Sequence, residues 1–508
     1  MKRIFEIMLL LFMVSSLAGC SNKKNNVAVD DHLTLTWYCR NYDSAIIDSY
    51  DNVAAYKEIQ NKLGIDIDFI HYTQDEQFQT MLATGRYPDI MEANWNSFEG
   101  GCKNAVDNII IKLNDYLSEH SVYLKKYLED DNILQALTLY DGTIAYFPQL
   151  KEEGKINAYI GPMIRADWLR KLNLKEPETI DEFTEMLKAF RDNDPNGNGM
   201  ADEIPFSIEK DGRFSSLSAA FGVFYNEIYA DESGKLVFGS IQDGFFEFLK
   251  LMRQWYEEGL LDDEFLAQNR AVFERKIKDD KVGATIAYMS SQMPLYNSYS
   301  TKSNEPIEYK AIAWLRKNEK IYNPINITEQ VSEVGTAIST QNQFPVESVK
   351  LLDYMYSDEA SRLLNWGIEN VTYTDVGGNL EFTEQILNNP SGLTPIVAIT
   401  PYCLTMRGGA KIMLSEPYQQ LNHLPYQTEA MSNWAIGDVY TKEKHFTFTP
   451  EDSKKINRIM KPIENYCNDM MIKFITGISS LEEFDSYVKT IEKMGIYDAI
   501  SVMERYGL

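Results

Sequence analysis

The sequence predicts an α/β protein built as two lobes, and three observations support this fold class. First, its 508 residues exceed one domain at roughly 100–200 residues each. Second, short β-rich stretches alternate with amphipathic stretches of helical period, which is the pattern of strands covered by helices. Third, no long linker divides the chain. The absence of a linker suggests that the two lobes exchange segments of chain.

The first α/β region begins with an alternating, β-rich stretch, LTLTW. A helix that ends at Gly85 precedes its third strand. The β-α-β-α-β order predicts a parallel sheet covered by helices. We expect strand, helix, strand, helix and strand in turn at residues 33–37, 52–63, 65–70, 76–84 and 88–91.

A second α/β region follows, and it ends in a helical tail. Thr179 is a suitable N-cap for one helix, and Gly259 ends another. From Pro450 onward, apolar residues recur every three or four positions, which is typical of helices. The expected strands are 158–165, 281–288, 309–314 and 334–339, and the expected helices are 165–172, 181–191, 245–258, 346–356 and 360–366.

The composition narrows the class of protein. Hydrophobic residues make up 44% and charged residues 24%, which is an ordinary globular balance. This excludes a disordered, collagen-like or multi-spanning membrane protein. With 49 basic and 75 acidic residues, the formal charge is -26, so the surface repels nucleic acid phosphates. This negative charge favours neutral or cationic small ligands. The alternative is that the charge serves only to keep the protein soluble.

The first 20 residues, MKRIFEIMLLLFMVSSLAGC, have the features of an export signal. Lys2 and Arg3 precede an apolar core at residues 7–14 that is too short for a transmembrane helix. Leu17-Ala18-Gly19-Cys20 resembles the lipobox of bacterial lipoproteins. That resemblance implies removal of residues 1–19, a lipid on Cys20, a tether over 20–32 and a body anchored outside the cell membrane. The alternative is an ordinary signal peptide with a chance cysteine.

Four further cysteines are widely spaced: Cys39, Cys102, Cys403 and Cys467. None forms a CxxC pair, and only five histidines are present, so we expect no zinc site. In a chain of this size we expect buried free thiols rather than a disulfide framework, with a single disulfide as the alternative.

Residues 192–203, DNDPNGNGMADE, resemble an EF-hand calcium loop in two registers. Calcium prefers six to eight oxygen ligands, which alternate short side chains supply around a glycine turn. One register begins at Asp192 and has Glu203 at position twelve. The other begins at Asp194. The alternative to calcium is a solvated Asn/Gly turn. A single loop favours a structural ion over a signalling one.

A longer pattern resembles one protein family. It comprises IRADWLRKLNLKEPETIDEF (Ile164–Phe183), the calcium loop, Ile204-Pro205, and shorter pieces such as GRYPDI and YEEGLL. This is similar to the extracellular solute-binding lipoproteins (family 1) of carbohydrate ABC transporters, in the branch related to alginate-oligosaccharide-binding proteins. The resemblance covers about residues 33–505.

The resemblance implies a two-lobe periplasmic-binding-protein-like fold of type II, with discontinuous lobes joined by a hinge. Lobe 1 would comprise residues 33–150 plus 334–395, and lobe 2 would comprise 151–333 plus 396–508. A carbohydrate would bind between the lobes of a monomer and pass to permease subunits in the membrane. In the family's register the structural calcium would be held by Asp194, Asn196, Asn198, the Met200 carbonyl, Asp202 and Glu203.

A sugar site needs flat rings for C–H faces and planar polar groups for hydroxyls. In such a fold, loops at strand ends line the cleft. Each candidate has a structural alternative, because a lone Trp is more often a core residue and Arg165–Asp167 could be a capping or inter-helix pair. The candidates are Trp37, Arg40, Asn94, Trp95, Tyr146, Arg165, Asp167, Trp168, Ser291, Gln292, Trp366, Glu369 and Tyr402.

Two other classes of protein compete with a sugar-binding importer component. A secreted glycoside hydrolase or polysaccharide lyase needs a suitable carboxylate pair, and 75 acidic residues could supply one. The chain nevertheless lacks the G-x-S-x-G, H-E-x-x-H, P-loop and GxGxxG motifs. The third class is an adhesive surface lipoprotein. We therefore expect a binding protein that is not an enzyme, while the sequence does not name its sugar.

Overall fold

A six-stranded mixed sheet carries much of the N-terminal part of the fold. The structure is a computed structural model, and it describes residues 33–98, 101–152, 159–209, 213–301, 305–324, 330–405, 409–439 and 448–506. The strand order is β15-β4-β12-β3-β1-β2. The strands are β1 (Leu33–Arg40), β2 (Ile65–Tyr72), β3 (Ile90–Asn94), β4 (Phe147–Lys151), β12 (Val331–Ile338) and β15 (Lys411–Met413).

Parallel pairing holds for only part of this sheet. β1 and β3 are parallel, with Trp37 opposite Ile90, as the β-α-β pattern predicts. β12 is antiparallel to both β3 and β4, so the expectation of a wholly parallel sheet is wrong. The cause is the long excursion of the chain between Lys151 and Val331, because β12 returns from a second sheet rather than through a crossover helix.

The second sheet has four strands in the order β10-β5-β9-β6. β5 is antiparallel to both β9 and β10, whereas β6 is parallel to β9. All six residues of β5 are buried, as expected for a strand covered on both faces. The strands are β5 (Ile160–Arg165), β6 (Ile204–Phe206), β9 (Val282–Tyr288) and β10 (Tyr309–Ala311).

The long helices occur where the apolar period predicts them. The α8 helix begins after Thr179, whose side chain accepts from the Glu182 N–H in a capping box. The α18 helix ends at Gly477, which adopts a left-handed conformation that favours glycine. The long helices are α1 (Ala54–Leu63), α2 (Asp75–Ala83), α8 (Ile180–Asp192), α9 (Asp243–Glu257), α12 (Pro345–Tyr354), α13 (Asp358–Trp366) and α18 (Pro450–Thr476).

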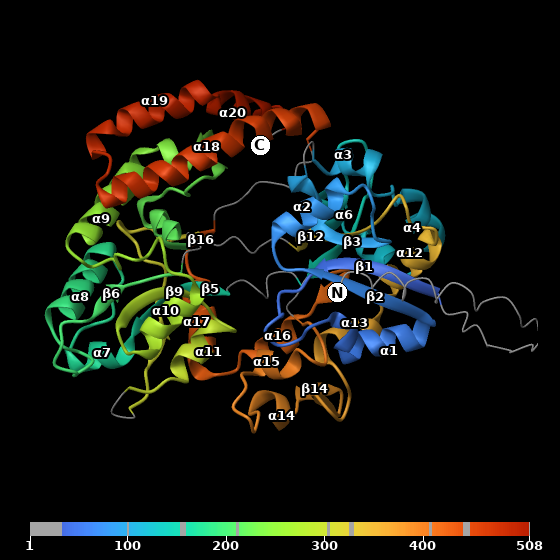
Figure 1. The fold of residues 1–508 in the computed structure, drawn as a ribbon, viewed down its shortest axis with the longest axis horizontal. Coiled ribbons are helices and arrows are strands. Elements are labelled where there is room, and N and C mark those ends of the chain that lie inside the picture. Colours follow the sequence, from blue (N-terminus) through green and yellow to red (C-terminus); the bar gives the residue numbers. More distant parts are fainter. Residues whose placement is uncertain are drawn as a thin grey trace, which may run out of the picture. The chain divides into compact units, whose positions relative to one another are not determined.

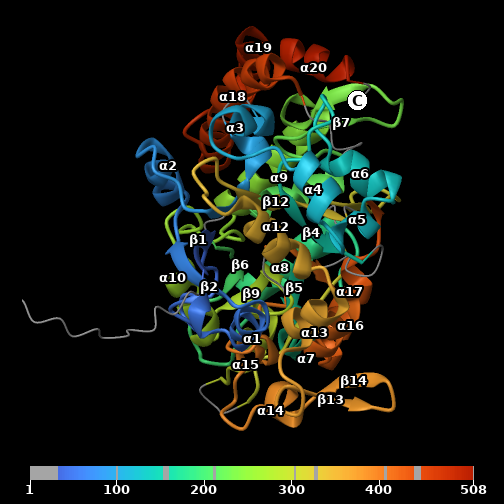
Figure 2. The same cartoon turned by 90° about the vertical axis from the view of Figure 1, so that its right-hand side faces the viewer.

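The remaining elements complete the fold. Figure 1 shows α1 beside α13, and these helices are in contact. Figure 2 shows the β13–β14 hairpin beside α14. The remaining elements are α3 (Gly101–Asn108), α4 (Asn114–His120), α5 (Leu124–Tyr127), α6 (Asp131–Leu137), α7 (Ala166–Lys171), α10 (Arg270–Lys278), α11 (Gln292–Asn297), α14 (Glu384–Leu387), α15 (Pro395–Ile399), α16 (Ser415–Leu421), α17 (Pro425–Trp434), α19 (Phe484–Met494), α20 (Ile496–Glu504), β7 (Ile228–Ala230), β8 (Leu236–Phe238), β11 (Tyr322–Asn323), β13 (Tyr373–Val376), β14 (Asn379–Phe382) and β16 (Asp438–Val439).

A large hydrophobic core joins the second sheet to the C-terminal helices. Phe248, Trp255 and Phe474 lie in it, which explains the helical period of the last 60 or so residues. Cys39, Cys102, Cys403 and Cys467 are all buried and free, as expected. Among the residues that the structure describes, no helix is both long and apolar enough to cross a membrane. The proposed signal segment, Cys20 and the tether lie outside the described residues.

The strand pairing changes one predicted crossing between lobes. We expected the chain to leave the first lobe near Ile396. Instead β15 pairs parallel to β4, with Lys411 opposite Gln149, so the chain is still in the six-stranded sheet at Met413. The α17 helix then packs against β10 of the four-stranded sheet. Because β15 completes an edge of the first sheet, we expect the last crossing to lie beyond Met413 rather than near Ile396.

Buried polar side chains form a row across one face of the six-stranded sheet. Glu92 lies opposite Thr336, and Lys411 lies opposite Gln149. Cys39 on β1 continues the row beside Glu92, and all five residues are buried. Burial raises the pKa of Glu92 to about 7, while the Lys411 charge acts in the opposite direction. A buried carboxylate in this row therefore titrates near neutral pH.

Glu92 should make stability depend on pH. Its folded-state pKa exceeds its unfolded value, so the folded state binds the extra proton and loses stability as pH rises from about 5 to 8. We expect Glu92→Gln to remove about 3 kcal/mol of that pH-dependent loss. Urea unfolding at both pH values measures the difference. Asp68→Asn, an exposed change on β2, should keep the wild-type slope. Equal slopes for wild type and Glu92→Gln would refute the assignment.

Candidate functional site

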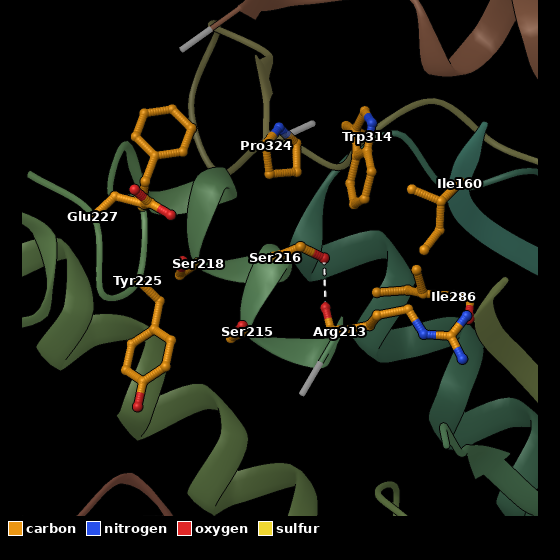
Figure 3. Close-up of a pocket in the computed structure, with 11 residues that line it drawn as sticks. Ile160, Arg213, Ser215, Ser216, Ser218, Tyr225, Glu227, Ile286, Trp314 and Pro324 are labelled. Atoms are coloured by element: carbon orange, nitrogen blue, oxygen red, sulfur yellow. Dashed lines mark hydrogen bonds between the residues drawn. The ribbon is translucent and has the colours of Figure 1, made fainter. Parts of the chain in front are cut away.

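A pocket lies against the four-stranded sheet, and Figure 3 shows its lining. It encloses about 160 Å³, less than the roughly 300–1,000 Å³ of sites that enclose a whole drug-sized ligand. It therefore suits one unit of a longer ligand. The lining comes from the 3-10 helix η3 (Arg213–Phe221), the loop after it, β5, β9 and the segments after β10 and β11. The lining residues are Ile160, Arg213, Ser215, Ser216, Ser218, Phe224, Tyr225, Glu227, Ile286, Trp314 and Pro324.

Arg213 supplies the guanidinium of this pocket. Its Nη1 donates to the Ile286 carbonyl at 3.1 Å and to Gln292 Oε1 at 2.9 Å. Its Nη2 lies 3.4 Å from a carboxylate oxygen of Glu209. Gln292 Nε2 also donates to Glu209, and Gln292 Oε1 accepts from the Tyr288 N–H at 2.9 Å. These contacts hold the guanidinium and the amide in fixed positions beside β9.

Two tyrosine rings stand next to Arg213. Tyr159 and Tyr288 are stacked, with ring centroids 6.1 Å apart and planes 13° apart. Each is 39% exposed, so one stacked pair of large rings faces solvent. The guanidinium of Arg213 lies 4.9 Å from the centroid of the Tyr288 ring, within cation–π range. The guanidinium and the neighbouring amide therefore help to fix the Tyr288 ring.

This arrangement combines flat apolar rings with planar polar groups and serine hydroxyls. Rings offer faces to C–H groups, while amide, guanidinium and hydroxyl groups bond to hydroxyls. Gln292, which the sequence predicts as a site residue, is only 1% exposed, so it positions Arg213 rather than facing a ligand. Ser291 is half-buried and is the N-cap of α11. Sequence reasoning missed Arg213 and Glu209. Arg213 begins the 3-10 helix η3 and Glu209 precedes it, and no regular hydrophobic pattern in the sequence marks either residue. Sequence reasoning also missed Tyr288, although it is the last residue of the predicted strand 281–288 that precedes the candidates Ser291 and Gln292.

The predicted aromatic platforms are core residues in this structure. Trp37, Trp95, Trp168, Trp366 and Tyr146 are each at most 3% exposed. Trp168 packs edge-on against Phe190 at 5.2 Å, and the Trp95 indole donates to the Gly335 carbonyl at 2.9 Å. Their ring faces are covered by other side chains. All five side chains therefore belong to the core, which is the alternative to a sugar contact that we gave for a lone Trp.

Arg165 and Asp167 form a buried ion network rather than a ligand-facing pair. The Arg165 side chain is fully buried, and its Nη2 and Nη1 lie 2.6 Å from Asp167 and Asp280 respectively. Its guanidinium also lies 4.5 Å from the centroid of the Trp168 ring. Two carboxylates and an aromatic face leave this cation no approach for a ligand. The pair links β5 to α7, as the alternative of a structural pair predicted.

The remaining predicted sugar contacts lie apart from the pocket lining. Arg40 ends β1 and lies 5.1 Å from the Tyr42 ring centroid. Asn94 ends β3 and donates to Glu333 at 3.1 Å. Glu369 is exposed, and the Tyr402 hydroxyl accepts from Gln385 at 3.3 Å. These residues come from segments of the six-stranded sheet and its helices, and none of them is in the lining of the pocket.

The predicted calcium loop folds around the carboxylate of Asp194. This carboxylate accepts from the N–H groups of Asn198 at 3.0 Å and Gly199 at 2.8 Å. Asn198 Nδ2 donates to Asp202 at 2.9 Å, and Lys281 pairs with Asp202 at 3.0 Å. Asp192 instead pairs with Arg191 through two hydrogen bonds of 2.7 and 3.0 Å. The geometry favours the register that begins at Asp194.

Glu203 is the residue of this loop whose surroundings fit a cation. Both of its carboxylate oxygens are buried and accept no hydrogen bond within the described part of the chain. Burial, with Asp194 and Asp202 nearby, raises the pKa of Glu203. Across the described residues, no cluster of three His, Cys, Asp or Glu is arranged to hold a metal ion. An oxygen-rich loop of carboxylates and amides nevertheless fits calcium, which accepts amide and carbonyl ligands.

Comparison with known proteins gives a family match. The model of the bacterial extracellular solute-binding protein family matches residues 47–362. A curated relative is the fructooligosaccharide ABC transporter substrate-binding protein FusA of Streptococcus pneumoniae, 28% identical over 89% of this chain and 86% of its own. Another is the lipoprotein LipO of Bacillus subtilis, 24% identical over 83% of this chain and 81% of its own.

Solved structures share the fold. The alginate-binding protein AlgQ2 without calcium ion matches with a TM-score of 0.74, at 20% identity, over 95% of this chain and 99% of its own. An EF-hand mutant of S. pneumoniae FusA in complex with fructo-nystose matches with a TM-score of 0.73, at 24% identity, over 93% of this chain and 98% of its own. The α/β, two-lobe binding-protein fold expected from the sequence is thereby confirmed.

Trp168 should act on stability rather than on ligand contact. Its ring is fully buried among the side chains of the large core, so Trp168→Ala should lower the free energy of unfolding by about 3–5 kcal/mol. Tyr497→Ala, on the exposed side of α20, should change it by no more than about 0.5 kcal/mol. Urea unfolding of the three proteins measures both effects. A Trp168→Ala protein as stable as wild type would contradict the core assignment.

Proposed function

This chain belongs to the bacterial extracellular solute-binding protein family, and we propose that it captures a carbohydrate and delivers it to an ABC importer in the membrane. The observation that carries the proposal is the site formed by the stacked Tyr159–Tyr288 pair beside the fixed Arg213 and Gln292 groups. Such a combination of ring faces and hydrogen-bonding groups suits a sugar. The name of the relative FusA, a fructooligosaccharide ABC transporter substrate-binding protein, supports it.

We propose closure of two lobes as the mechanism. Lobe 1 carries the six-stranded sheet, lobe 2 carries the four-stranded sheet, and the last crossing follows Met413. A carbohydrate held on the pocket of lobe 2 would gain contacts from lobe 1 only in the closed form, and would therefore shift the population toward it. Arg40 and Asn94, at the ends of β1 and β3, are the proposed lobe 1 contacts. The monomer would dock on the permease when closed.

The family consists of binding proteins, and we propose that this chain does not cleave its ligand. We also propose anchoring to the outer face of the cell membrane through a lipid on Cys20. The lipobox-like residues 17–20 support the anchor, as does the name of the relative LipO, a lipoprotein. A secreted polysaccharide-degrading enzyme and an adhesive lipoprotein remain the alternatives that a ligand assay must separate.

Thermal unfolding with a panel of oligosaccharides tests the proposed function. A ligand at about 100 times its dissociation constant should add about 2.7 kcal/mol of stability. We expect one class of glycan to raise the unfolding temperature, with no shorter sugars released. Tyr288→Ala should weaken that binding about tenfold, or 1.4 kcal/mol, because a stacking face is lost. Tyr497→Ala is the matched control. Cleavage of the glycan, or no shift with any sugar, would refute a sugar-binding importer component.

We further propose a structural calcium ion in the loop at residues 194–203. Asp194, Asn196, Asn198, the Met200 carbonyl, Asp202 and Glu203 would hold it, because they supply the oxygen ligands that calcium prefers. The ion would supply positive charge to the buried Glu203 carboxylate. Asn196 also donates to the Asp280 carbonyl at 3.1 Å, so an ordered loop supports the start of β9. The EF-hand mutant reported for FusA is consistent with such a loop.

Calcium should stabilise the wild-type chain and depend on the Asp194 register. We expect millimolar calcium to raise the unfolding temperature relative to chelator, and Glu203→Gln or Asp194→Asn to abolish most of that rise. Asp192→Asn should keep it, because Asp192 pairs with Arg191 instead. Differential scanning calorimetry with and without calcium measures the rise. If Asp192→Asn lost the effect and Asp194→Asn kept it, the register would begin at Asp192.

A further inference from the structure

The charge of the pocket bears on which carbohydrates it accepts. Arg213 is the only basic residue among the eleven described residues that line it. Its side chain is 10% exposed, and that of its partner Glu209 is 14% exposed, so the pair is largely removed from water. The guanidinium charge is therefore already matched by a carboxylate within the protein.

A carboxylated sugar would need a cation at this position. Moving a carboxylate out of water is costly unless it is paired, and arginine does this best through a bidentate fork. Nη1 of Arg213 already donates to the Ile286 carbonyl and to Gln292 Oε1. Nη2 of Arg213 lies 3.4 Å from a carboxylate oxygen of Glu209, so a ligand carboxylate that approached Nη2 would also meet the like charge of Glu209. Two carboxylates brought together in a place largely removed from water disfavour one another's ionised form.

The rest of the site favours hydroxyl groups over carboxylates. Glu227 is the acidic residue among the described residues of the lining, and the whole chain carries a formal charge of -26. The hydroxyls of Ser215 and Ser216 in the lining suit neutral hydroxyls. The Tyr159–Tyr288 pair offers a flat face to an uncharged ring. No part of this set requires an anionic ligand.

We infer that the Arg213–Glu209 pair makes this pocket selective for neutral oligosaccharides and excludes those built from uronic acids. The inference rests on the proposed carbohydrate-binding function and adds the chemical class of the substrate. Arg213 then acts as a fixed hydrogen-bond donor and ring support rather than as an anion receptor, and Glu209 is the residue that determines specificity.

Two measurements on the purified chain in calcium test this inference. The first is isothermal titration calorimetry with fructo-, malto-, xylo- and galacto-oligosaccharides of three to five units. Alginate and polygalacturonate oligomers of the same lengths are the acidic counterparts. We expect at least one neutral class to bind, and every uronate to bind at least 100-fold more weakly. A uronate bound as tightly as the best neutral sugar would overturn the inference and leave the proposed function intact. If no sugar binds, both fail.

The second measurement tests Glu209 itself. Glu209→Gln removes the carboxylate that matches Arg213, so the affinity for uronates relative to the best neutral sugar should rise at least tenfold. Glu185→Gln, which removes the same charge from the exposed surface of α8, should leave the ratio within about threefold. An unchanged ratio in a folded Glu209→Gln protein would overturn the role of the pair. The wild-type panel decides selectivity even if this variant does not fold.

Discussion

The buried guanidinium of Arg165 is the interaction on which much of the second sheet depends. It is the last residue of β5, and it binds Asp167 at the start of α7 and Asp280 just before β9. Removing either acid would leave a buried charge partly unpaired, at a cost of about 3–5 kcal/mol. Asp280 also has a φ of 62°, a left-handed conformation that an aspartate adopts at some cost. Its position is therefore maintained by the ion network.

This network connects the two functional regions of the second sheet. The Asp280 carbonyl receives Asn196 from the proposed calcium loop, at one end of the β5–β9 ribbon. At the other end of the ribbon, Ile160 pairs with Tyr288, and the stacked tyrosines stand beside Arg213. The β5–β9 ribbon therefore joins the proposed calcium loop to the base of the pocket through paired and mostly buried residues.

Local order along the chain was predictable from the sequence, whereas pairing between distant segments was not. The helix after Thr179 and the strand before Tyr72 follow from capping and alternation, which are short-range effects. The antiparallel insertion of β12 depends on where the chain returns after about 180 residues, which no local pattern encodes. Five of the six aromatic candidates are buried, because a place near a strand end or a crossing does not specify whether a side chain faces the core or solvent. Gln292 was found because its position follows a strand end, whereas Arg213 has no such mark.

The buried thiols give the folded chain a chemical property of its own. Burial raises the pKa of Cys102 to about 12 and that of Cys403 and Cys467 to about 11, so the reactive thiolate is scarce at each. The pKa of Cys39 is raised as well. No cystine is present among the described residues either. The described part of the chain is therefore held together without a disulfide crosslink, so a reducing agent has no such bond to break there.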